Sequence, residues 1–73
     1  MDVIVAAVDE ILVRLPFVVE YDVPCSVREE DYLFYELLPT VSAICDDLGI
    51  YELSIIVLAT KIYVAIAVDQ VRH

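Results

Sequence analysis

The apolar run from Leu53 to Val68 constrains the fold of this chain more than any other segment. Lys61, near its centre, is the only charged residue between Glu52 and Asp69. A charge at the middle of a bilayer costs roughly 2.5–3.5 kcal/mol on insertion scales, and the run is slightly short for a membrane span of about 20 residues. β-Branched residues crowd both halves, which favours two strands over one helix. We therefore expect a pair of strands and no contact with a membrane.

Alternating side chains define these two expected strands. The connection near Thr60 and Lys61 contains no Gly or Asn, so the turn type is not specified. The last strand is apolar on both faces, which predicts a central position in a sheet. One face of the first strand would consist of Leu53, Ile55, Val57 and Ala59, and one face of the second of Ile62, Val64, Ile66 and Val68.

The N-terminal segment repeats apolar residues with the period of a helix. Asp2 is suited to the N-cap, and Pro16 restricts Leu15 and so ends the helix. A strand remains an alternative because the segment is rich in valine. The next segment, Phe17–Val23, alternates apolar and polar residues up to Pro24, which predicts a half-buried strand. The apolar positions of the first helix are Ile4, Ala7, Val8, Ile11, Leu12 and Leu15.

A second helix is predicted between Ser26 and Leu48. Ser26 and Glu29 have the spacing of a capping box, and Gly49 is suited to the position that follows a helix. Pro39 removes one backbone hydrogen bond, yet the apolar stripe keeps its phase on both sides, which predicts one helix kinked at Pro39. The stripe consists of Phe34, Leu37, Leu38, Val41, Ile44, Cys45 and Leu48.

These elements together predict an α+β fold in the order α-β-α-β-β. Placing the last strand between the other two gives a three-stranded antiparallel sheet in the order 1-3-2, packed with helices. At 73 residues the chain is expected to form a single domain, residues 1–73, of nearly minimal size. The expected core contains Phe34, Leu37, Val41, Ile44, Val64 and Ile66.

The two cysteines, Cys25 and Cys45, are expected to be free thiols. If they bracket one continuous helix, about 30 Å separates them, whereas a disulfide needs Cα atoms within about 7 Å. No positively charged region of a secretory signal follows Met1. We therefore expect a cytoplasmic protein in which the thiols fill small spaces in the core.

Residue types that carry catalysis are not arranged for it. The only histidine, His73, is the last residue, and no Ser, Cys or Lys has a visible activating partner. No phosphate loop, calcium loop or zinc spacing occurs in the sequence. The paired acids Glu29–Asp31 and Asp46–Asp47 lie at predicted helix ends, where capping and solvation explain them. We expect neither an enzyme nor a cofactor.

The polar side of the second helix is the candidate binding face. The chain has 13 acidic and four basic residues and a net charge of −9, so it attracts basic partners. Stepping 100° per residue places Tyr32 and Glu36 nearly opposite Phe34. Tyrosines with an acidic rim are suited to a basic surface. Alternatively, the tyrosines lie along a neighbouring element and the acids serve only solubility. The predicted partner-binding residues are Glu29, Tyr32, Tyr35, Glu36, Asp46 and Asp47.

Size and charge predict a small acidic, non-enzymatic binding protein. By analogy with small acidic inhibitors, many of them encoded by phages, we expect it to dock on a basic surface of a nucleic-acid-handling machine, such as RNA polymerase or a nuclease, and to inhibit or modulate it. Its charge disfavours direct contact with nucleic acid. The alternative is a structural or assembly subunit of a homo-oligomer or obligate complex, because both faces of the expected strands are apolar.

Overall fold

The computed structural model describes residues 2–15 and 28–71, which form three helices. These are α1 (Val3–Arg14), α2 (Glu29–Asp47) and α3 (Leu53–Val71), and the described ranges contain no strand. The predicted α+β fold, with its α-β-α-β-β order and three-stranded sheet, is therefore wrong. The expected strand Phe17–Val23, and with it Cys25, Ser26 and His73, lie outside the described residues.

Helix α1 agrees with its sequence pattern. The Asp2 carboxylate accepts a hydrogen bond from the Ile4 amide at 2.9 Å, so Asp2 is the N-cap as predicted. Leu15 leaves the helix with extended backbone angles, φ −122° and ψ 91°, as expected for a residue before proline. Every predicted apolar position is buried or packs against the core: Ile4, Ala7, Val8, Ile11, Leu12 and Leu15.

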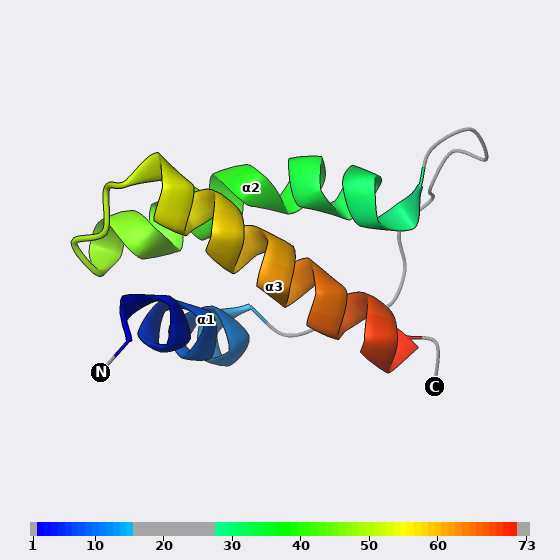
Figure 1. Ribbon diagram of the computed structural model, residues 1–73, viewed down its shortest axis with the longest axis horizontal. Helices are drawn as coiled ribbons and strands as arrows, with labels where there is room; N and C mark the ends of the chain where they lie inside the picture. Colours follow the sequence, from blue (N-terminus) through cyan, green and yellow to red (C-terminus); the bar gives the residue numbers. More distant parts are fainter. Residues whose placement is uncertain (1, 16–27, 72–73) are drawn as a thin grey trace.

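Helix α2 begins later than the sequence predicted. Its N-cap is Arg28, whose side chain makes no capping hydrogen bond, and the predicted N-cap, Ser26, lies outside the described residues. The helix continues through Pro39 as one element, as predicted, and its second half approaches α1 (Figure 1). The buried residues of its apolar stripe are Leu33, Leu37, Val41, Ile44 and Cys45.

A tight turn after α2 reverses the chain into α3. Gly49 has φ 76°, in the left-handed region. The Gly49 amide donates to the Asp46 carbonyl at 3.0 Å, and the Ile50 amide donates to the Cys45 carbonyl at 2.8 Å. This pair of bonds is the Schellman motif, which confirms the role predicted for Gly49. It sets α2 and α3 side by side in opposite directions (Figure 1).

Helix α3 replaces the two predicted strands. Thr60, expected at the connection between them, lies in mid-helix, where its hydroxyl donates to the Ile56 carbonyl at 2.7 Å. Apolar residues line α3 on nearly every side, and such a run carries neither a helical nor a strand period. The absent turn residues at Thr60–Lys61 were the more informative signal, because 19 residues without Gly or Pro can continue as one helix.

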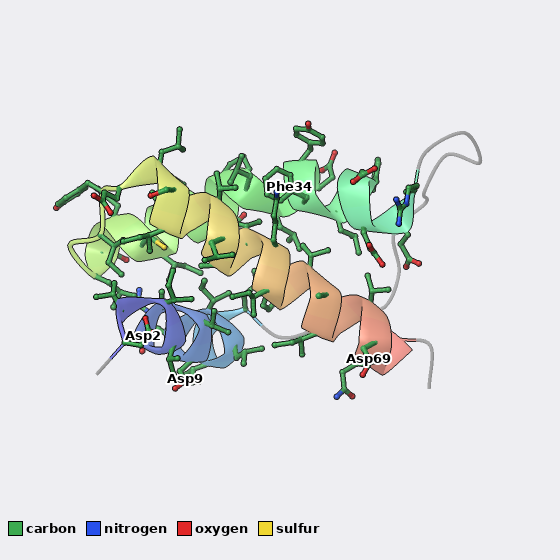
Figure 2. The ribbon with its side chains drawn as sticks, viewed as in Figure 1. Asp2, Asp9, Phe34 and Asp69 are labelled. Carbon is green, nitrogen blue, oxygen red and sulfur yellow. The ribbon has the colours of Figure 1, made fainter. Side chains whose placement is uncertain are left out.

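All three helices contribute to one core, with α3 packed against both others (Figures 1 and 2). Tyr63 is fully buried, and its hydroxyl donates to the Leu15 carbonyl at 2.9 Å. This bond ties α3 to the end of α1. Four of the six expected core residues, Leu37, Val41, Ile44 and Val64, are buried, while Phe34 and Ile66 are partly buried against the core.

Candidate functional site

Helix α2 carries six of the 13 acidic residues of the chain and no Lys or Arg. Glu29, Glu30 and Asp31 occupy its first turn, where negative charge is stabilised by the helix dipole. Asp46 and Asp47 occupy the opposite end, where the dipole opposes negative charge. Five of the six carboxylates are exposed, and Glu29 is half-buried.

The two tyrosines of the predicted site have different surroundings. Tyr35 is 73% exposed, as predicted, whereas Tyr32 is partly buried against the core. The reason is the orientation of α2. Leu33 is buried and Phe34 only half-buried, so the core-facing side lies nearer to Tyr32 and farther from Tyr35 than the predicted stripe implied.

The predicted site divides into two groups along α2. Glu29, Tyr32, Tyr35 and Glu36 belong to the first half of the helix. Asp46 follows Glu36 by ten residues, about 15 Å along the axis. The structure therefore places the six predicted residues on one helix but does not bring them into one compact patch.

Asp47 already has a partner within the protein. Its carboxylate accepts a hydrogen bond from Arg14 of α1 at 3.1 Å, and Arg14 also bonds Glu10 at 2.7 Å. These carboxylates, Glu10 foremost, raise the pKa of Arg14. The Arg14–Asp47 pair is exposed and so contributes little stability, but it lowers the negative charge that Asp47 offers to a partner. Asp46 and Glu36 are exposed and form no ion pair within the described residues.

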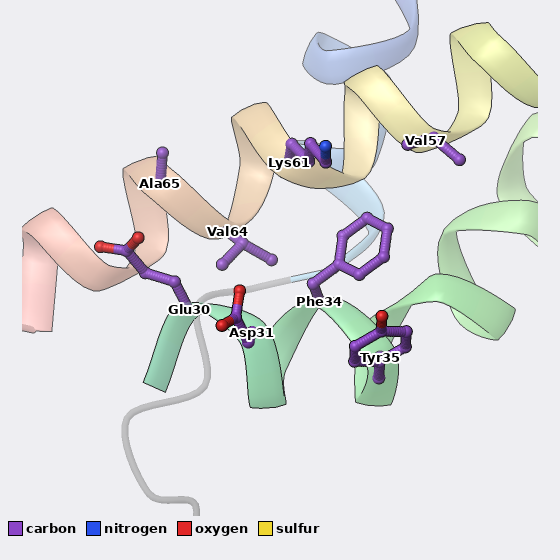
Figure 3. A pocket seen from close by; sticks show the side chains of 8 residues that line it. All are labelled: Glu30, Asp31, Phe34, Tyr35, Val57, Lys61, Val64 and Ala65. Atoms are coloured by element: carbon purple, nitrogen blue, oxygen red, sulfur yellow. The ribbon is translucent and has the colours of Figure 1, made fainter. Parts of the chain in front are cut away.

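An open groove of about 550 Å³ lies between α2 and α3 (Figure 3). Sequence reasoning missed it because the α3 segment was interpreted as two strands. The helical spacing of Val57, Lys61, Val64 and Ala65 could have indicated a common face. The groove is lined by Glu30, Asp31, Phe34 and Tyr35 from α2 and by Val57, Lys61, Val64 and Ala65 from α3.

A second, shallower hollow of about 390 Å³ lies where α2 turns into α3. Of the predicted site residues it includes only Asp46. Tyr51, at its edge, is 74% exposed. The hollow is lined by Pro39, Ser42, Ala43, Asp46, Ile50, Tyr51 and Ile56.

Among the described residues no group of three or more His, Cys, Asp or Glu side chains could hold a metal ion. Cys45 is a free, fully buried thiol, and burial raises its pKa, which is unfavourable for a nucleophile. This burial agrees with the predicted role of Cys45 in the core.

The window Leu53–Gln70 of α3 is long and apolar enough to cross a membrane, with a mean hydropathy of 1.7. Because this segment is one helix, the expected pair of strands no longer argues against a membrane span. The central Lys61 still opposes a span. In the bundle 39% of the window is buried, so part of it belongs to the core. This is weak evidence for a span, because the core helix of a soluble protein has the same composition.

Comparison of the chain with protein-family models, with curated proteins and with solved structures finds no significant match.

Proposed function

We propose that this protein is a non-enzymatic binding protein that docks the acidic side of α2 on a basic protein surface. The observation that carries the proposal is the charge of α2, with six carboxylates, five of them exposed, and no cation. Exposed like charges on one helix repel one another. A basic partner relieves this repulsion. The carboxylates attract such a partner over a distance of about one Debye length, roughly 8 Å at physiological salt.

Helix stability does not account for the charge pattern of α2. The acids of the first turn stabilise the helix, but Asp46 and Asp47 oppose its dipole at the other end. Only Asp47 is compensated, by Arg14. Residues that weaken their own helix and remain exposed are candidates for contact with another molecule.

Tyr35 supplies an aromatic contact within this acidic surface. Its ring is exposed, and tyrosine combines a rigid apolar body with a polar tip, which suits it to binding hot spots. The exposed ring and the exposed Glu36 carboxylate next to it in the sequence offer an apolar surface and a charged acceptor, a combination suited to Lys or Arg.

The partner we propose is a nucleic-acid-handling machine, such as RNA polymerase or a nuclease, that is inhibited or modulated by the bound protein. Surfaces that bind nucleic acid are rich in Lys and Arg, so they are complementary to a chain with a net charge of −9. The charge disfavours direct contact with nucleic acid.

Affinity capture from a lysate of the native host tests this function. The immobilised protein is compared with Glu36→Lys on α2 and with the matched control Asp9→Lys, an exposed acid on α1 (Figure 2). Each substitution raises the net charge by two units. We expect the parent and Asp9→Lys to retain a basic protein that salt releases, and Glu36→Lys to lose it. Equal capture by the parent protein and both variants would contradict a role for α2.

A second candidate function is assembly with further copies of the chain. Val5 and Val13 of α1 are 52% and 78% exposed, and with Asp9 they lie at helical spacing on one side. Sedimentation at increasing protein concentration tests this function. A dimer that Val13→Lys dissociates would support it.

A further inference from the structure

The groove between α2 and α3 has two chemically different ends (Figure 3). Glu30 and Asp31 lie at one end, beside Val64 and Ala65 of α3. Phe34 and Tyr35 lie toward the other, beside Val57 and Lys61. The groove is therefore acidic at one end, aromatic at the other, and apolar between them.

Contacts among its own residues orient the aromatic end. The rings of Phe34 and Tyr35 meet edge to face, with centroids 5.2 Å apart and planes at 80°. Phe34 points toward α3 (Figure 3), and the Lys61 ammonium lies 5.9 Å from its ring centroid. Because a cation already occupies this position, a second cation is disfavoured there.

The acidic end, in contrast, carries negative charge that is not neutralised by a strong ion pair. Asp31 is exposed and forms no ion pair within the described residues. Within the described residues Glu30 pairs only with Arg28, at 3.8 Å, and both side chains are exposed, so this pair is weak. Ala65 is exposed and small, which leaves the floor of the groove open beside the two acids.

We propose that the groove binds an amphipathic, cationic helix of the partner, with its Lys or Arg residues at the Glu30–Asp31 end. The proposal rests on the proposed function and identifies the part of the partner that is bound. Apolar side chains on such a helix meet the accessible side chains of Val57 and Ala65. Helices commonly bind by laying an apolar face into a groove between two others, and the added helix completes a four-helix arrangement.

Charge complementarity favours this occupant over a second copy of the chain. Two copies each carry a net charge of −9 and repel one another. A cationic helix is attracted by the whole molecule and is then oriented by the two ends of the groove.

The test uses a fluorescently labelled model peptide of Leu and Lys that forms an amphipathic helix. A Leu/Glu peptide of the same pattern and a Ser/Lys peptide of the same charge are the control probes. Fluorescence anisotropy at low salt measures affinity for the full chain. We expect the Leu/Lys peptide to bind at least about tenfold more tightly than either control, because both charge and apolar surface contribute.

Variants of the protein locate the bound peptide. Ala65→Trp fills the groove, and Val3→Trp adds the same ring at an exposed site on α1. Asp31→Lys reverses a groove charge, and Asp9→Lys makes the same change on α1. We expect Ala65→Trp and Asp31→Lys to weaken binding at least about tenfold relative to their controls. Circular dichroism verifies that each variant is folded.

Three results overturn the inference. One is failure of the Leu/Lys peptide to bind the parent protein more tightly than the Ser/Lys peptide. Another is equal binding by Ala65→Trp and Val3→Trp, both folded. The third is a dimer of the parent protein that Ala65→Trp dissociates, because the groove would then be occupied by a second copy of the chain. If one of these three results is obtained while Glu36→Lys still abolishes capture of the basic partner, the groove is wrong and the proposed function stands, since Glu36 does not line the groove.

Discussion

Gly49 allows the chain to reverse between α2 and α3. Its φ of 76° is rarely adopted by residues with a Cβ, although an added Cβ would meet no atom within 4 Å. The cost of Gly49→Ala is therefore backbone strain alone, about 1–2 kcal/mol in the free energy of unfolding. Urea unfolding followed by circular dichroism measures it. Asparagine tolerates this conformation better than alanine, so Gly49→Asn should lower the free energy of unfolding by less. An Ala variant as stable as the parent would contradict the turn.

Cys45 provides a chemical probe of the core. Burial raises its pKa, so in a Cys25→Ser background the native thiol should react slowly with a thiol reagent and rapidly once unfolded. The unfolded thiol ionises at a lower pH than the native one. Stability should consequently be constant below the ordinary thiol pKa and fall as pH rises through that value. Equal reaction rates in native and unfolded protein would show that Cys45 is accessible.

At the scale of elements, the amphipathic helices were predictable and the apolar one was not. In α1 the period of Ile4, Ala7, Val8 and Ile11 predicted both the helix and its buried face, and Asp2 predicted where the helix begins. In α3 nearly every position is apolar, so the alternation from Ile62 to Val68 was equally compatible with a helix. Preferences of β-branched residues amount to less than about 1 kcal/mol each, and packing against α1 and α2 outweighs them.

The candidate site was predictable only in part, for a related reason. The acids and Tyr35 could be read from the period of α2, but a burial pattern rotated toward Leu33 placed Tyr32 partly against the core. The groove needs Lys61 and Ala65 on the same side of a second helix. Lys61 and Ala65 do not share one helix face if residues 60 and 61 form a turn between two strands.

Helix α3 should remain in the bundle when a membrane is offered. Tyr63 and Thr60 are fully buried with satisfied hydroxyls, and Lys61 lies at the middle of the apolar window, where it opposes insertion. In flotation with vesicles of neutral lipid, we expect the purified protein to stay in the dense fraction. Recovery of most of the protein with the vesicles would contradict the predicted absence of membrane contact.

At the scale of the whole molecule, the negative charge surrounds the bundle but is concentrated on α2. Asp2 and Asp9 lie on the α1 side and Asp69 near the end of α3 (Figure 2). General attraction of a basic partner thus depends on every acid, whereas orientation of the complex depends on α2. The two effects can be separated because Glu36 and Asp9 are both exposed acids on different helices.

The most direct test is the association rate of the captured basic partner with Glu36→Lys and with Asp9→Lys, measured from low to physiological salt. Because the two variants have the same net charge, any difference between them reports position rather than total charge. We predict that Glu36→Lys associates at least about threefold more slowly than Asp9→Lys at low salt, and that the difference shrinks as salt screens it. Identical rates at every salt concentration would show that α2 does not direct binding.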